Sequence, residues 1–164
     1  MEAAQAFRHY KTVAHGKHSE DHDEEIYQLA TCYYEGLGCT QNRPLAYKYF
    51  KMAAFLNHAH AQFMTGYCYF HGKGVDMDVT KGVAWFRKAI LLAQPDAEEM
   101  MGFCYRFGTG VAAVNRKFAR EHYRKAVEIG DEHSIFHNAG THAAEMLIAM
   151  DEEEASVHHF LGVP

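Results

Sequence analysis

The stretch AQFMTGYCYFHGKGVDMDVTKGVAWFRKA, residues 61–89, decides the fold because its landmarks recur before and after it at a nearly constant spacing. These landmarks are small residues, aromatic residues and a G-x-G turn: Gly66, Tyr69, Gly72, Gly74, Trp85, Phe86 and Ala89. Thirty-six residues upstream they correspond to Ala30, Tyr33, Gly36, Gly38, Tyr49, Phe50 and Ala53. Downstream, Ala97, Gly102, Tyr105, Gly108 and Gly110 keep this spacing, and a one-residue insertion then shifts Ala119, His122, Tyr123 and Ala126. A period of this length indicates an array of structural repeats.

Each repeat is expected to form two helices joined by a glycine turn. Residues 61–71 carry apolar side chains at helical spacing, and Gly72 then ends the helix because glycine adopts a left-handed conformation at low cost. The second helix follows Asp78 and Thr80, either of which can cap its free N–H groups. Its predicted buried stripe consists of Gly82, Trp85, Phe86 and Ala89.

The repeated pattern is a small residue, a tyrosine, a G-x-G turn and then A-x-x-W/Y-F/Y-x-K-A-A. Over residues 25–140 it resembles the Sel1-like repeat family, a relative of the tetratricopeptide repeats. Departures are Ala30 in place of a glycine, Gly82 in place of an alanine, and the extra residue in the third loop. The resemblance implies an all-α fold, a right-handed α-solenoid of antiparallel helix pairs, and a role as an adaptor or scaffold in protein–protein interaction.

We expect one repeat domain over residues 1–164. Its predicted parts are a half-repeat helix at 1–14, repeats at 25–60, 61–96 and 97–133, and capping helices at 134–164. The half repeat places Ala6, His9, Tyr10 and Val13 where the central repeat has its buried stripe.

Two segments flank the predicted array. The charged stretch at 15–25 is expected to be a loop. Near the other end, residues 133–150 are expected to form a capping helix, which a solenoid needs because its last repeat has no neighbour. Residues 151–161 are expected to form a further helix with an acidic start.

Composition narrows the classes of function. The 164 residues are 48% hydrophobic, and the formal charge of −5 argues against general affinity for nucleic acid or anionic membranes. No apolar run approaches the roughly 20 residues that span a bilayer. The first 20 residues lack the apolar centre of a secretory signal, so a cytoplasmic location is expected.

The cysteines are predicted to be free, packed thiols. Cys32, Cys68 and Cys104 share one repeat position, and stacked helices lie about 8 to 10 Å apart. A disulfide needs Cα atoms within about 7 Å. Cys39 lies outside this series and could meet Cys32. Secreted relatives link the end of one repeat to the start of the next, a spacing that this chain lacks.

Thirteen histidines raise the possibility of a metal site. One candidate is the pair His133 and His137, four residues apart on a predicted helix. The other is the predicted loop, with His15, His18 and His22 beside Asp21 and Asp23. Neither comes with a known ligand motif, so surface or packing roles are favoured, and no metal or cofactor is predicted.

The sequence gives little support for catalysis. None of the three serines, Ser19, Ser134 and Ser156, lies in G-x-S-x-G, and the cysteines occupy predicted packing positions. The G-x-G turns lack the G-K-S/T that would hold a phosphate. The chain is therefore predicted not to be an enzyme. A metal-dependent ligand binder or an enzyme stays as the alternative of another class.

A basic cluster lies on the second helix of the third repeat: Arg116, Lys117, Arg120, Arg124 and Lys125. The spacing puts Lys117, Arg120 and Arg124 on one outward face. A solvated convex face is the favoured interpretation, and an acidic protein partner is the alternative.

By analogy with tetratricopeptide arrays, variable positions of the first helices are expected to line a concave groove. These positions are Tyr27, Thr31, Tyr34 and Glu35; Phe63, Tyr67, Phe70 and His71; and Glu99, Phe103, Arg106 and Phe107. Aromatic residues and arginine dominate binding hot spots, so the groove is predicted to bind a peptide or a protein partner. The alternative is that several of these residues pack between repeats. Tyr69, which recurs as Tyr33 and Tyr105, is expected to be buried.

The sequence therefore predicts a protein-interaction module that is a monomer or weak oligomer, with no nucleic-acid partner and no insertion into a membrane. Its resemblance leaves two narrower roles open. One is an adaptor for a membrane-associated complex. The other is a bacterial immunity-type or host-interaction protein that binds and blocks a toxin or effector.

Overall fold

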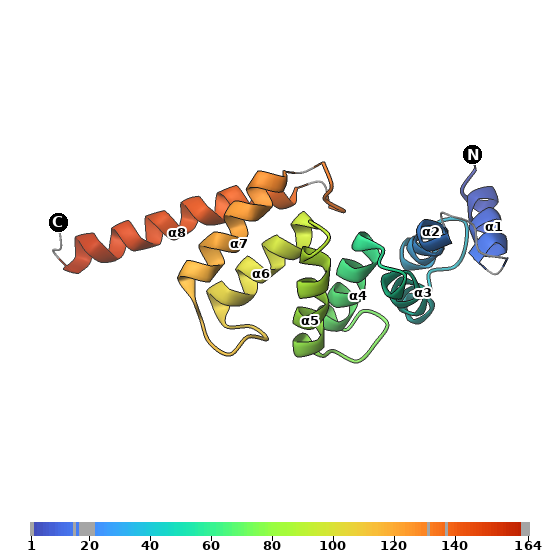
Figure 1. Cartoon of the computed structure of the whole chain (residues 1–164), viewed down its shortest axis with the longest axis horizontal. Coiled ribbons are helices and arrows are strands. Elements are labelled where there is room, and N and C mark those ends of the chain that lie inside the picture. The colour runs from blue at the N-terminus through green and yellow to red at the C-terminus, as the bar shows by residue number, and fades with distance from the viewer. Residues whose placement is uncertain (1, 15, 17–21, 131, 137, 162–164) are drawn as a thin grey trace. The chain divides into compact units, whose positions relative to one another are not determined.

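The computed structural model describes residues 2–14, 16, 22–130, 132–136 and 138–161, with side chains in the last helix through residue 156. This part of the chain contains eight α-helices and no strand, which confirms the predicted all-α class (Figure 1). The helices are α1 (Ala3–Ala14), α2 (His22–Glu35), α3 (Arg43–Phe55), α4 (Ala59–His71), α5 (Val79–Ile90), α6 (Pro95–Phe107), α7 (Arg116–Ile129) and α8 (Ala139–Leu161).

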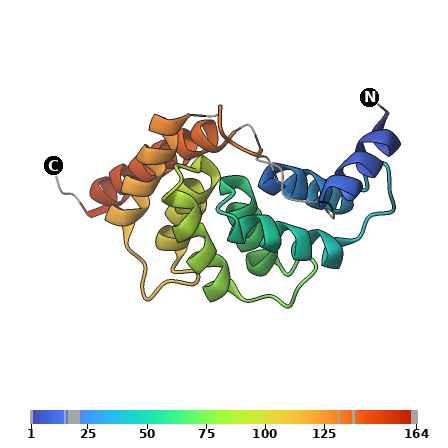
Figure 2. The same ribbon diagram turned by 45° about the vertical axis from the view of Figure 1, so that its right-hand side comes forward.

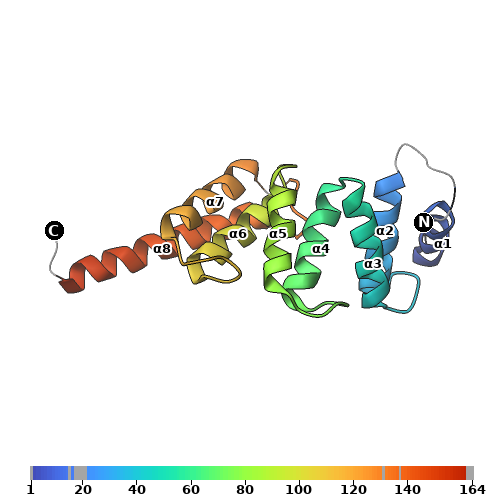
Figure 3. The same cartoon turned by 60° about the horizontal axis from the view of Figure 1, so that its bottom comes forward.

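The chain divides into two compact units, Met1–Leu92 and Ala93–Pro164, here called unit one and unit two. In unit one, α2 pairs with α3 and α4 with α5, while α3 also packs against α4 and α1 against α2 (Figure 3). In unit two, α6 pairs with α7, and α8 packs against both (Figure 2). Each helix pair consists of a first and a second helix of one repeat.

The predicted helix ends are confirmed. Gly72 and Gly108 close α4 and α6 in the left-handed conformation, with φ of 65° and 72°. At the start of α5, the Asp78 side chain accepts a hydrogen bond from the N–H of Lys81 at 2.9 Å. Asn42 and Asn115, 36 residues before and 37 after Asp78, cap α3 and α7 in the same way.

The second glycine of the G-x-G turn is required by a close backbone approach. A Cβ atom on Gly74 would lie 2.2 Å from the carbonyl oxygen of Arg43, and one on Gly38 would lie 2.2 Å from that of Ala3. Both glycines also have positive φ. The turn therefore ends one helix and at the same time rests on the second helix of the preceding repeat.

Small residues within the helices bring each pair together. A Cβ on Gly66 would lie 2.8 Å from the ring of Phe86, and one on Gly102 would lie 2.6 Å from the ring of Tyr123. The recurring alanines of the second helices are fully buried: Ala53, Ala89 and Ala126. The prediction of a buried stripe is wrong for one residue, Trp85, which is only half-buried. It packs edge-to-face on Phe55 beside Lys88.

The recurring tyrosine is also less buried than predicted. Tyr69 is half-buried, and its hydroxyl forms a 2.6 Å hydrogen bond with that of Tyr47 on α3. A phenol that keeps such a polar partner lies at the edge of the core. Tyr33 stacks on Tyr49 and has the ring of Phe7 at its edge, 5.4 Å away. The recurring tyrosine therefore contacts the preceding repeat at the edge of the core.

Helix α1 confirms the helix predicted at 1–14, but its predicted stripe is not buried. Its one buried residue is Ala14, while Tyr10 is half-buried and His9 is exposed. The predicted loop at 15–25 is too long, because α2 already begins at His22. Three acidic residues in the first turn of α2, Asp23, Glu24 and Glu25, suit the positive end of the helix dipole.

The C-terminal helices differ from the prediction in two ways. Residues 132–136 are turn and bend instead of helix, because the buried Asp96 carboxylate binds this segment. It accepts hydrogen bonds from the Ser134 hydroxyl and from the backbone N–H of Ile135, each at 2.8 Å. Beyond the turn, α8 runs without a break from Ala139 to Leu161, so the acidic residues at 151–154 lie within a helix and do not start one.

Candidate functional site

Two register positions on the first helices, four residues apart, keep their side chains outside the core. In α4 they hold Tyr67 and His71, whose ring centroids lie 4.3 Å apart. In α6 they hold Phe103 and Phe107, 4.8 Å apart. Phe103 is 38% exposed and Phe107 55% exposed. We call these two contacts the aromatic pairs. In α2 the same positions hold Thr31 and Glu35, so the first repeat has no such pair.

In unit one, Tyr34 belongs to the surroundings of the first aromatic pair. Burial, followed by the nearby phenol of Tyr67, raises the pKa of Tyr34 to about 12. The guanidinium of Arg43 lies 5.5 Å from the centre of the Tyr34 ring. Burial, followed by the charge of Lys73, lowers the pKa of His71. At neutral pH the surface thus offers uncharged phenol and imidazole groups that can form hydrogen bonds.

Three aromatic residues predicted to line the groove are core residues instead. Phe63 is 1% exposed, and Phe70 and Tyr27 are each 9% exposed. Phe63 and Phe70 both pack on Phe86 of α5, with ring centroids 5.5 and 5.7 Å apart. They occupy the helix face that meets the second helix of the same repeat. Their assignment to an exposed groove is therefore corrected.

Of the remaining predicted residues in α2, Thr31 donates a hydrogen bond to the carbonyl oxygen of Tyr27 at 3.1 Å. Its hydroxyl is thereby satisfied within the helix. Glu35 is exposed at the end of α2. Neither residue contributes the aromatic surface seen in the later repeats.

In unit two, α8 covers part of the predicted groove. Glu99 forms an ion pair with His142 of α8, and the pKa of Glu99 is raised, chiefly by burial. Arg106, whose side chain is only 10% exposed, forms an ion pair with Glu153 and contacts the sulfur of Met146. These residues hold the C-terminal helix and do not offer free groups to a partner.

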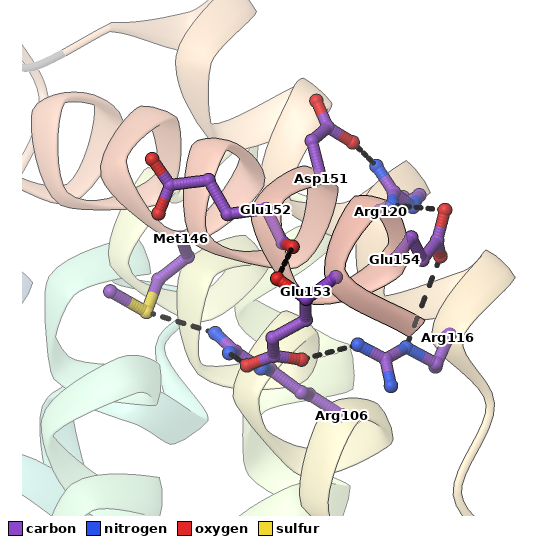
Figure 4. A network of polar contacts seen from close by, with 9 residues as sticks. Arg106, Arg116, Arg120, Met146, Asp151, Glu152, Glu153 and Glu154 are labelled. Carbon is purple, nitrogen blue, oxygen red and sulfur yellow. Dashed lines mark hydrogen bonds and ion pairs between the residues drawn. The ribbon is translucent and has the colours of Figure 1, made fainter. Parts of the chain in front are cut away.

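Two members of the basic cluster of α7, Arg116 and Arg120, form ion pairs with α8, and of these only Arg120 departs from the predicted solvated face (Figure 4). Arg116 pairs with Glu153, and Arg120 pairs with Asp151 and, at 2.9 Å, with Glu154. The Arg120 side chain is 16% exposed, and its hydrogen bonds to these two carboxylates raise its pKa. The other members of the cluster, like Arg116, are exposed: Lys117, Arg124 and Lys125.

Within the described residues, no group of three or more His, Cys, Asp or Glu side chains could hold a metal ion. His133 lies in a turn, so its predicted helical pairing with His137 is wrong, and His137 itself lies outside the described residues. His15, His18 and Asp21 of the other candidate also lie outside them. The prediction for that loop is untested.

The four cysteines fit packing roles better than reactive ones. Cys32, Cys68 and Cys104 are buried, and Cys39 is half-buried. Burial raises the pKa of Cys68 to about 12, so this thiol is protonated at neutral pH. The Cys39 thiol donates a hydrogen bond to the carbonyl oxygen of Cys32 at 3.4 Å.

As to a membrane, none of the helices in the described part of the chain combines the length and the apolar character needed to cross a bilayer.

The helix pairs, their glycine turns and their 36-residue register define an α-solenoid repeat protein. Comparison with known families narrows this class, because residues 26–58, 59–93 and 95–131 each match the Sel1 repeat. The chain belongs to the Sel1 repeat family, whose members are commonly protein-interaction modules. No curated protein matches the chain.

Several solved structures are similar. A Sel1 repeat protein from Oxalobacter formigenes is 32% identical with a TM-score of 0.69, the match covering 78% of this chain and 56% of that one. A protective antigen of uropathogenic Escherichia coli with the same repeat fold is 31% identical with a TM-score of 0.71. The match covers 78% of this chain and 26% of the antigen. Cysteine-rich protein B of Helicobacter pylori shares the fold, with 24% identity and a TM-score of 0.55. The match covers 71% of this chain and 96% of that protein. The chain thus spans about half the length of the Oxalobacter formigenes protein and about a quarter of the length of the Escherichia coli antigen.

Proposed function

We propose that this chain is a non-catalytic, cytoplasmic adaptor that binds a peptide or protein partner through the aromatic pairs, one on α4 of unit one and one on α6 of unit two. The observation behind the proposal is that each of two successive repeats has a pair of aromatic rings in contact within its own first helix, at the same register positions and outside the core. Burying such rings only in a complex supplies binding energy that the free fold does not use.

The chemistry of this surface favours a partner with both apolar and hydrogen-bonding groups. In unit one, the Tyr67–His71 pair lies near the Tyr34 phenol, which itself is flanked by the cation of Arg43. In unit two, the apolar part of this surface is supplied by the Phe103 and Phe107 rings, which are 38% and 55% exposed. Rigid aromatic side chains beside cations are the residues that most often dominate protein-binding hot spots.

The test begins with a peptide-display selection against the wild-type chain. The affinity of the selected peptides is then measured by calorimetry for the double variant Tyr67→Ala with Phe103→Ala. We expect binding to weaken by at least about 2 kcal/mol, roughly thirtyfold. Phe118→Ala is the matched control, because Phe118 is 43% exposed on the second helix α7. Equal affinity of the double variant and the wild type would place the binding site elsewhere.

A further inference from the structure

Arg43 of unit one is a half-buried cation whose charge is unpaired among the described residues. It is the first residue of α3, directly after the cap residue Asn42. Its guanidinium lies 5.5 Å from the centre of the Tyr34 ring on α2, which holds it by a cation–π interaction. No carboxylate or other acceptor of the described residues bonds to this guanidinium, and of its three nitrogens only Nε is fully buried. The two terminal nitrogens are therefore open to a ligand.

The equivalent arginine of unit two shows which group this register position accepts. Arg116 is likewise the first residue of its helix, α7, and follows the cap residue Asn115. It pairs with the Glu153 carboxylate of α8, which also pairs with Arg106 of α6 (Figure 4). Arg106 occupies the register position of Tyr34, since each stands two residues before the first glycine of its G-x-G turn. One carboxylate is thus held between a first and a second helix.

In the described part of unit one, the same two positions meet no acidic helix. The helix that packs on α3 there is α4, where burial raises the pKa of Cys68 and the charge of Arg43 partly opposes this. Near Tyr34, α4 contributes this thiol and the Tyr67 phenol of the aromatic pair. Neither carries a carboxylate. Glu35, which also acts on Tyr34, is exposed and forms no ion pair with Arg43. The arginine therefore lacks the carboxylate that its counterpart has.

We propose that Arg43, held on the Tyr34 ring, binds a carboxylate of the partner, supplied by a glutamate or aspartate next to an apolar residue that contacts the Tyr67–His71 pair. A guanidinium donates two parallel hydrogen bonds to a carboxylate, so the terminal nitrogens of Arg43 suit this group. This inference rests on the proposed function and states the chemistry of its partner: a peptide segment in which an acidic residue adjoins an apolar one.

The test uses two acetylated dipeptide amides, Phe-Glu and Phe-Gln, which are alike in size and differ in charge. The Nε–H resonance of Arg43 in a ¹H–¹⁵N spectrum of the wild-type chain provides the measurement, because this nitrogen is shielded from solvent. We expect Phe-Glu to shift the resonance saturably and to bind about fivefold more tightly than Phe-Gln. Equal affinity of the two dipeptides, or no shift of this resonance at millimolar Phe-Glu, would overturn the inference.

Four variants assign the contact. Arg43→Gln should abolish the preference for Phe-Glu with an unchanged helical dichroism spectrum, whereas Lys48→Gln, at an exposed position of the same helix, should keep it. Glu35→Gln should strengthen the binding of Phe-Glu, because it removes a like charge near the site. Lys73 is the cation near His71, and Lys73→Gln should leave the preference intact. A preference that survived in Arg43→Gln and disappeared in Lys73→Gln would refute the role of the arginine.

These measurements fail separately from the test of the proposed function. If the variant Tyr67→Ala with Phe103→Ala kept full affinity for the selected peptides, the proposed function would fail, while a preference for Phe-Glu that requires Arg43 would still support the carboxylate site. If that variant lost affinity but the two dipeptides bound alike, the aromatic pairs would keep their role and the carboxylate site would be refuted.

Discussion

The equivalent helices α4 and α6 differ most at two shared register positions. In α4 these positions hold Phe63 and Phe70, which are buried against Phe86 of the neighbouring α5. In α6 they hold Glu99 and Arg106, which form ion pairs with α8. The side chain at each of these equivalent positions thus matches the helix that packs on it. Within unit one the contact is aromatic, and in unit two an acidic terminal helix is held by charge.

The largest expected effect tests this difference directly. Phe63→Ala should destabilise the protein by about 3 to 5 kcal/mol, because it leaves a cavity against Phe86. Glu99→Ala, at the same position of the next repeat, should cost about 1 kcal/mol or less, since its partner His142 is 44% exposed and can be solvated. Urea denaturation followed by helical dichroism measures both variants. Equal losses would show that the two positions are packed alike.

The small positions of the second helices should instead behave alike in both units. Ala89 and Ala126 are each fully buried, so Ala89→Leu and Ala126→Leu should each cost about 1 to 3 kcal/mol through overpacking. Ala84→Leu is the control, because Ala84 is exposed on α5. Thermal melts provide the comparison. An unchanged melting temperature for Ala89→Leu would contradict the assigned register.

These contrasts explain how far the sequence could predict the structure. The 36-residue recurrence identified the helix pairs, and Gly72 and Asp78 located two helix ends, because each needs only local backbone geometry. The sequence prediction placed Phe63 and Phe70 in the groove and not in the core, because an aromatic residue suits either place. Residue type alone does not say which face of the first helix meets α5. The 3.6-residue period places them on the Gly66 side of the helix, a signal that could have identified them.

The engagement of the basic cluster depends on a contact that is distant in sequence. Arg120 and Asp151 are 31 residues apart, and no repeat relates them, because α8 departs from the repeat pattern. The acidic run at 151–154 resembles a helix start in sequence, but in the structure its charges pair with the arginines of α6 and α7. Asp96 was likewise missed, since its role requires the fold to bring Ser134 beside it.

A smaller effect should appear where charge alone holds α8. Hydrogen bonds from Arg106 and Arg116 lower the pKa of Glu153, so their stabilising contribution is present above its ordinary pKa of 4.5 and is lost as pH falls below it. The amides of 151–156 should therefore become more mobile in acid, as measured by heteronuclear NOE. Those around the buried Ala143 should not change. Glu153→Gln should reduce this change, because the amide cannot titrate.

The smallest expected change in stability concerns the aromatic pairs, and it separates binding from folding. Tyr67 is half-buried and Phe103 is exposed, in contrast to the fully buried Phe63 one helical turn from Tyr67. Truncating both rings should therefore alter the free energy of unfolding by about 1 kcal/mol or less, far below the loss expected for Phe63→Ala. Thermal and urea melts of the double variant measure this directly. Because the same variant is expected to lose at least about 2 kcal/mol of peptide affinity, a stability loss of equal size would mean that the rings support the fold, whereas a selective loss of affinity would assign them to the partner.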